Sequence, residues 1–113
     1  METRIKTYLL DIHTSIDEID SFLPEKRDFF SFQNDLKTRK AVERNIEIIG
    51  EAVNRIVKLD DSIIINNAKR IIGTRNRLAH EYDIISIEII WTIVTKELPN
   101  LKEEIDLLLK KYS

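Results

Sequence analysis

Residues 41–56 of the chain read AVERNIEIIGEAVNRI, and this segment is the clearest indicator of the fold class. Its valines and isoleucines recur in steps of three and four residues, as on one face of an α-helix, at Val42, Ile46, Ile49, Val53 and Ile56. Charged side chains occupy the other face, where Glu51 precedes Arg55 by four residues, a spacing that supports a helix. The pattern predicts a long amphipathic helix over about residues 34–58.

The N-terminal stretch repeats this apolar pattern. Its stripe runs from Ile5 to Leu23 and predicts a helix that ends before Pro24. Residues 24–32 read as a connection whose aromatic side chains either fold back onto the helices or reach a partner; these are Phe29, Phe30 and Phe32.

The C-terminal half predicts three shorter helices. Residues 68–79 form the first. Ser86 suits the N-cap of the next, which we expect to end near Leu98 because Pro99 cannot continue a regular helix. Pro99 also suits the first turn of the last helix, which buries Leu101, Ile105, Leu108 and Leu109.

The composition agrees with helices as the building material. The 113 residues include two glycines and two prolines, too few for the tight turns of an all-β fold. A chain of this length fits one domain that buries roughly two thirds of its surface. We expect a single all-α domain over residues 1–113, folded as an antiparallel bundle of four to five helices.

Several classes of chemistry are excluded by what the sequence lacks. The chain has no cysteine, so it has no disulfide, thiolate nucleophile or cysteine-based zinc site. No apolar run approaches the roughly 18 residues of a membrane span, and Glu2, Arg4 and Lys6 stand where a signal peptide would become apolar. We therefore expect a cytoplasmic protein without a membrane partner.

The charge distribution singles out one local basic segment. The net charge of −2 argues against nonspecific coating of nucleic acid, which needs many cations. Between Asn66 and His80, however, the charged residues are all basic: Lys69, Arg70, Arg75 and Arg77. This segment is the candidate anion-binding site.

The end of this segment, residues 75–82, reads RNRLAHEY. Arg75 and Asn76, followed after three residues by His80, resemble the signature of the HEPN ribonucleases, and the ending His80, Glu81, Tyr82 resembles the HepT branch. The likeness extends in the right order through residues 41–52, 91–94 and 98–101.

This resemblance implies a HEPN-like fold and a metal-independent endoribonuclease without a cofactor. It implies the toxin of a type VII-like toxin-antitoxin pair, acting as a homodimer with a composite cleft. The implied partner is an MNT-type nucleotidyltransferase that neutralises the toxin by attaching AMP to the tyrosine after the histidine, here Tyr82.

The residue types fit this chemistry. Metal-free RNA cleavage needs a proton acceptor for the 2′-hydroxyl, a donor for the leaving oxygen and positive charge on the phosphorane. His80 exchanges protons near neutral pH, and Arg75 holds phosphate oxygens in its planar fork. On a continuous helix Asn76 shares a face with His80 and orients it or donates to phosphate. Lys69, Arg70 and Arg77 are the expected RNA-backbone contacts.

One geometric difficulty follows from the spacing. Five residues at about 100° each place Arg75 and His80 roughly 140° apart on an ideal helix. The two share a site only if the helix loosens before His80, if Arg75 reaches round, or if two copies of the chain line one cleft.

Simpler structural roles stay open beside these interpretations. His80 could cap a helix end, Arg75 could pair with Glu47 or Glu51, and Tyr82 could be a half-buried core tyrosine. Glutamates at 43, 47 and 51 could be read as metal ligands, but an ion-paired face is the more common explanation. At the level of function, the alternative is a noncatalytic HEPN module that binds a nucleotide or docks a nucleotidyltransferase.

Overall fold

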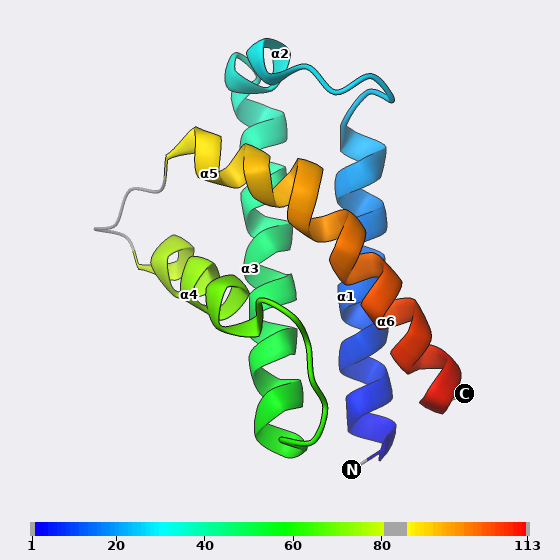
Figure 1. The fold of residues 1–113 in the computed structure, drawn as a ribbon. Helices are drawn as coiled ribbons and strands as arrows, with labels where there is room; N and C mark the ends of the chain where they lie inside the picture. The colour runs from blue at the N-terminus through cyan, green and yellow to red at the C-terminus, as the bar shows by residue number, and fades with distance from the viewer. Residues whose placement is uncertain (1, 81–85, 113) are drawn as a thin grey trace.

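Helices form the whole framework of the computed structural model, which describes residues 2–80 and 86–112. They are α1 (Glu2–Phe22), α2 (Phe29–Gln33), α3 (Leu36–Leu59), α4 (Ala68–Ala79), α5 (Ile87–Thr92), a π-helical segment (Ile93–Glu97) and α6 (Leu98–Tyr112). α1 and α3 lie antiparallel, α4 packs on α3, and α6 packs on α1 (Figure 1). Within the described ranges there is no strand, and the predicted all-α bundle is confirmed.

The core lies where the two predicted stripes meet. Every apolar position predicted on α1 and α3 is buried, and most of these side chains are at most 2% exposed: Ile5, Leu9, Ile12, Ile16, Ile19, Val42, Ile46, Ile49, Val53 and Ile56. Leu101 and Ile105 of α6 close the core from the other side. Burial of these side chains drives the association of α1, α3 and α6.

The connection after α1 contains a short helix that the sequence pattern did not predict. Asp28 begins α2 by accepting a hydrogen bond from the Phe30 amide (3.1 Å). Phe32 is buried with its ring centroid 5.1 Å from that of Trp91, and Phe29 meets Trp91 edge-on at 5.9 Å. Two of the three phenylalanines thus fold back onto the bundle, whereas Phe30 is 71% exposed.

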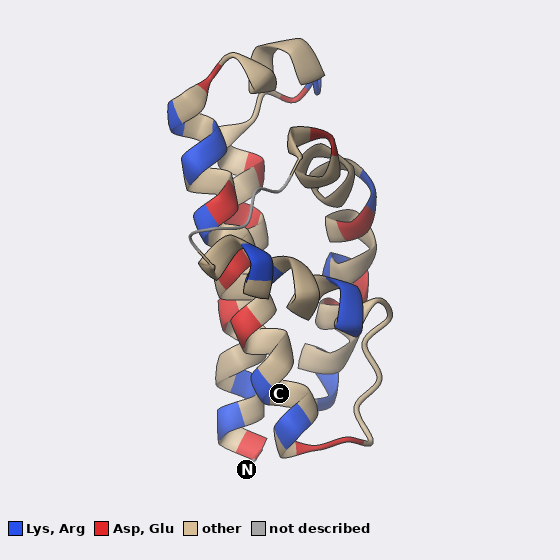
Figure 2. Ribbon diagram, turned by 90° about the vertical axis from the view of Figure 1, so that its left-hand side faces the viewer, with Lys and Arg blue, Asp and Glu red and all other residues tan. Residues whose placement is uncertain are grey.

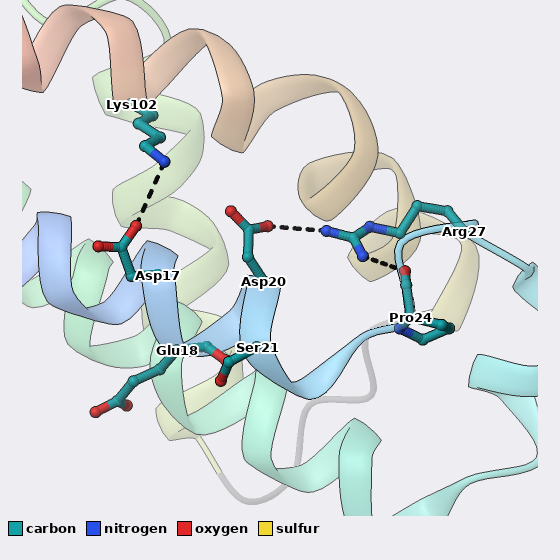
Figure 3. A network of polar contacts seen from close by, with 7 residues as sticks. All are labelled: Asp17, Glu18, Asp20, Ser21, Pro24, Arg27 and Lys102. Carbon is teal, nitrogen blue, oxygen red and sulfur yellow. Dashed lines mark hydrogen bonds and ion pairs between the residues drawn. The ribbon is translucent and has the colours of Figure 1, made fainter.

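A polar network sets the end of α1 (Figure 3). Arg27 pairs with Asp20 (2.9 Å) and also donates to the carbonyl oxygen of Pro24, so it holds the turn after the helix. One turn earlier, Asp17 pairs with Lys102 of α6 (3.4 Å). This second pair links the exposed sides of α1 and α6 and adds to the apolar packing between them.

The predicted boundary near Leu98 coincides with the start of α6, but the chain stays helical across it. α5, the π-helical segment and α6 follow one another without a break from Ile87 to Tyr112 (Figure 1). A proline ring would collide with the carbonyl four residues earlier in a regular helix. The wider π-helical turn ends two residues before Pro99, and such an insertion shifts the carbonyls that the ring would meet. The irregular turn therefore allows the helix to continue.

The contact between α3 and α4 depends on Gly50. A Cβ atom placed on Gly50 would lie 2.2 Å from Cβ and 2.9 Å from Cγ of Arg75, and 3.1 Å from the carbonyl oxygen of Ile71. No larger residue fits unless the two helices move apart. Arg75 of the basic motif is therefore pressed directly against the backbone of α3.

α4 packs on the core through Ile71 and through the partly buried Ala68, Ile72 and Leu78. Its only fully buried residues are Ile71 and Thr74. An ion pair adds to this contact, because Arg70 Nε lies 3.5 Å from Oε1 of Glu97 in the π-helical segment. The Glu97 side chain is 9% exposed, and neither carboxylate oxygen makes a hydrogen bond to a described residue. Arg70 therefore compensates a buried charge while it ties α4 to the C-terminal helix.

We expect Gly50→Ala to lower the free energy of unfolding by about 1–3 kcal/mol, because the new methyl overlaps the stem of Arg75. Gly73→Ala is the matched control: a Cβ there meets no atom within 4 Å, so the better helix propensity of alanine should raise stability by up to about 1 kcal/mol. Urea unfolding of both variants measures the difference. Equal effects would contradict the close approach.

We expect Arg70→Ala to destabilise the chain by about 1 kcal/mol, because it removes the ion pair of a buried carboxylate. Lys69→Ala, one residue away and exposed, should cost under about 0.5 kcal/mol. The measurement is again equilibrium unfolding. A Lys69 variant as destabilised as the Arg70 variant would show that the loss comes from the general charge of α4.

Candidate functional site

The basic motif occupies the C-terminal end of α4. Asn76, Arg77 and His80 are exposed, whereas Arg75 is half-buried against α3. Lys69 and Arg70, the other predicted RNA contacts, are exposed on the first turns of the same helix. Arg75 faces α3 and Arg70 faces Glu97 of the π-helical segment, so the basic groups lie on more than one side of this short helix. Acidic and basic positions alternate along the other helices (Figure 2).

His80 lies just beyond the helix. α4 ends at Ala79, and His80 is the C-cap with φ −93° and ψ 111°, an extended conformation. Its backbone N–H donates to the carbonyl oxygen of Arg77 (3.3 Å). The helix therefore loosens before His80, which is one of the three arrangements that the spacing left open, and the position at a helix end that the simpler reading gave it is confirmed.

This geometry corrects the expected relation between Asn76 and His80. The two share a helix face only if the helix continues through residue 80, and it does not. Asn76 instead contacts its neighbour: its Oδ1 accepts a hydrogen bond from Nη1 of Arg75 (2.8 Å). The amide thus orients the arginine, and its Nδ2 donors still point away from that bond.

Arg75 forms an ion pair with α3. Its Nη2 contacts Oε2 of Glu51, whose Oε1 accepts a hydrogen bond from Nε of Arg55 (2.7 Å). The simpler reading of Arg75 as a partner of a glutamate on that helix is therefore confirmed for Glu51. The Arg75 side chain keeps 30% of its surface exposed, so the pair does not cover all of its donors.

A cavity of about 390 Å³ opens beside Arg75. It lies among α1, α3 and α4, and its walls contain three arginines and three carboxylates: Arg44, Arg55, Arg75, Asp11, Glu47 and Glu51, with Tyr8 and Ala79 at its sides. The Glu51 carboxylate and then Tyr8 raise the pKa of Arg55, which lies 6.0 Å from the Tyr8 ring centroid.

Sequence reasoning missed this cavity. The polar residues of α3 have the spacing of an ordinary solvated face. A pair of Arg75 with one of its glutamates was considered, but nothing in their order shows that Tyr8 closes the same space from α1. Gly50 was the available signal, since a glycine in the middle of a helix costs stability and calls for a reason such as a close helix contact.

Three candidates from the sequence remain: Tyr82, the glutamates of α3 and the second histidine. Tyr82, the predicted acceptor of AMP, lies outside the described residues. The glutamates considered as metal ligands do not converge: within residues 2–80 and 86–112, no three His, Cys, Asp or Glu side chains are placed to hold a metal ion. The second histidine, His13, lies between Asp17 (3.3 Å) and Asp106 (3.6 Å), where it links α1 to α6.

None of the described helices is long and apolar enough to cross a membrane.

Comparison with known proteins places the chain in a family. Residues 12–108 match the model of the family described as ribonuclease HepT-like. A protein of Thermococcus cleftensis named probable ribonuclease HepT is 34% identical over 97% of this chain and 100% of its own length. Two proteins of Methanocaldococcus jannaschii named putative RNases are 34% and 35% identical, over 92% and 94% of this chain and 95% and 88% of their own lengths.

No solved structure matches the chain. The family model nevertheless covers most of the sequence, from α1 to the last turns of α6, and it includes the whole of the basic motif on α4. The chain belongs to the HepT-like ribonuclease family.

Proposed function

We propose that this ribonuclease cleaves RNA without a metal ion, with Arg75, Asn76 and His80 as its catalytic groups. One observation carries the assignment: at the end of α4 the Arg75 guanidinium is held in place by two contacts, while His80 follows in an exposed, extended segment. A fixed cation beside an exposed imidazole is what phosphoryl transfer to a 2′-hydroxyl requires.

The reaction can be written with this chain's own groups. The 2′-oxygen of the RNA attacks the adjacent phosphorus, and a bond from phosphorus to the 2′-oxygen forms while the bond to the 5′-oxygen breaks. An imidazole such as that of His80 takes the proton of the 2′-hydroxyl, and an acid returns a proton to the leaving 5′-oxygen. Arg75 faces the extra negative charge of the phosphorane. The products are a 2′,3′-cyclic phosphate and a 5′-hydroxyl.

This scheme favours a homodimer. It needs a base and an acid at once, whereas the motif supplies one histidine per chain. Two copies related by a two-fold axis would bring two histidines and two Arg75 side chains to one cleft. Lys69, Arg70 and Arg77 would then extend the positive surface along the RNA backbone, with Arg70 sharing its charge between RNA and Glu97.

We further propose that the chain is the toxin of a toxin-antitoxin pair whose partner is a nucleotidyltransferase of the MNT type. AMP attached to Tyr82, two residues after His80, would bring a phosphate next to the basic motif. The phosphate would compete with RNA for Arg75 and Arg77 and so neutralise the toxin. The noncatalytic alternative, a module that only binds nucleotides or the partner, uses the same basic surface and is separated by the next experiment.

His80→Ala should lower the rate of RNA cleavage by at least about a hundredfold, because it removes the general acid-base group. The fold should be retained, since substitutions at exposed positions usually cost under about 0.5 kcal/mol. The matched control is His13→Ala. It removes the second histidine of the chain, which lies on α1, and should leave cleavage unchanged.

The assay uses a labelled RNA in EDTA and a second RNA with 2′-deoxyribose at the scissile position. Cleavage by the wild type should persist in EDTA and stop with the deoxy substrate, because the 2′-oxygen is the nucleophile. Full activity of the His80 variant would overturn the assignment. Absence of any cleavage by the wild type, together with retained RNA binding, would favour the noncatalytic module.

Tyr82→Phe should remain a ribonuclease and become resistant to neutralisation, because it keeps the ring and lacks the oxygen that accepts AMP. Intact-mass measurement after incubation with the partner nucleotidyltransferase and ATP should show one adenylyl group on the wild type and none on this variant. Tyr8→Phe and Tyr112→Phe are the controls and should be modified like the wild type. Adenylylation that persists on the Tyr82 variant would assign the acceptor to another residue.

A further inference from the structure

One carboxylate connects the basic motif to the core helices. Glu51 on α3 uses both of its oxygens on arginines: Oε2 contacts Nη2 of Arg75, and Oε1 accepts from Nε of Arg55 (2.7 Å). On the other side, Nη1 of Arg75 donates to Asn76 (2.8 Å). Arg55, Glu51, Arg75 and Asn76 thus form a chain of polar contacts that begins on α3 and ends on the exposed side of α4.

The contact with Arg75 is strongly determined by its surroundings. Oε2 of Glu51 is buried and makes no hydrogen bond to the described residues, so the Arg75 guanidinium is the group that compensates its charge. Gly50, the residue before Glu51, lets the stem of Arg75 lie against α3 at a distance that no Cβ would permit. The arginine is therefore fixed at its base by packing and at its tip by charge.

The carboxylate itself cannot easily turn away. Arg55 holds its second oxygen from the following helical turn, and Arg55 in turn lies over the Tyr8 ring of α1. A side chain with two opposite contacts loses little further freedom when its partner binds a ligand. The Glu51 carboxylate that contacts Arg75 is therefore held in place by residues of two core helices, α1 and α3.

Arg75 keeps donors for a second anion. A guanidinium has five N–H groups, and the contacts with Glu51 and Asn76 use one on each Nη atom. The remaining donors belong to a side chain that is 30% exposed. The same guanidinium can therefore hold the carboxylate on its buried side and a phosphate on its open side.

We infer that Glu51 is a positioning residue, which orients Arg75 for the phosphate of the RNA and does not itself touch the substrate. This inference rests on the proposed ribonuclease function. An arginine released from Glu51 would have to be ordered anew in each transition state, and a misplacement of about 1 Å at such a group costs on the order of a hundredfold in rate.

The test compares Glu51→Gln with Glu47→Gln. Both substitutions remove one negative charge from α3 beside the same cavity, one helical turn apart. Glu47, however, pairs with Arg44 (3.9 Å), whereas Arg75 pairs with Glu51. We expect Glu51→Gln to lower kcat by about ten- to a hundredfold with KM changed by less than about threefold. Glu47→Gln should change neither.

A second measurement does not depend on cleavage. Nitrogen-15 NMR of the arginine guanidinium groups should show separate Nη1 and Nη2 signals for Arg75 in the wild type, because its rotation is hindered by two contacts. Glu51→Gln should merge these signals and Glu47→Gln should leave them separate. The Arg75 signals are assigned by their loss in Arg75→Lys.

Each outcome bears on one claim. If the wild type does not cleave RNA, the proposed function fails, and the NMR comparison still decides whether Glu51 orders Arg75. If Glu51→Gln cleaves as fast as the wild type or faster, Glu51 does not position Arg75 for the reaction and the inference is overturned. Equal losses in both glutamine variants would assign the effect to the charge of the cavity. Should Glu51→Gln fail to fold, Arg55→Gln, at a 55% exposed site, frees Glu51 from the other side and should also lower kcat.

Discussion

The position of α4, and with it the whole basic motif, depends on the close approach of α4 to α3 at Gly50. α1, α3 and α6 are held by a continuous apolar core, whereas α4 contributes one buried isoleucine, Ile71, and the partly buried Ala68, Ile72 and Leu78. This apolar contact is supplemented by backbone contact at Gly50 and by two ion pairs, one to each neighbouring element: Arg75 with Glu51 and Arg70 with Glu97. Charge and close packing thus place the helix that carries the basic motif.

This arrangement explains why a chain with a net charge of −2 can present a basic helix. Two basic residues of α4, Arg70 and Arg75, form ion pairs with carboxylates that belong to other helices. Each pair offsets the cost of a buried carboxylate oxygen and leaves part of the guanidinium exposed. The acidic residues of the core helices therefore support the basic surface and do not simply cancel it.

The sequence was sufficient for those features that depend on periodicity. The stripes of α1 and α3 follow from apolar spacing, because burial of one helix face dominates their energy. The predicted bounds of α4, residues 68–79, also agree with the structure. The sequence was insufficient where one residue changes the backbone locally: the π-helical turn before Pro99 and the short α2 begun by Asp28. The cavity beside Arg75 was missed because it needs three helices in contact.

The pairing of Arg75 with Glu51 was considered from the sequence as a rival to a role in catalysis, and the geometry removes this opposition. A carboxylate that used the whole guanidinium fork would indeed compete with phosphate. Here the carboxylate meets one Nη atom and Asn76 the other, while Arg55 occupies the second carboxylate oxygen. The bidentate pair that would block the arginine is therefore prevented by Arg55. A structural ion pair and a catalytic cation are compatible in one side chain when the partner's second oxygen is already taken.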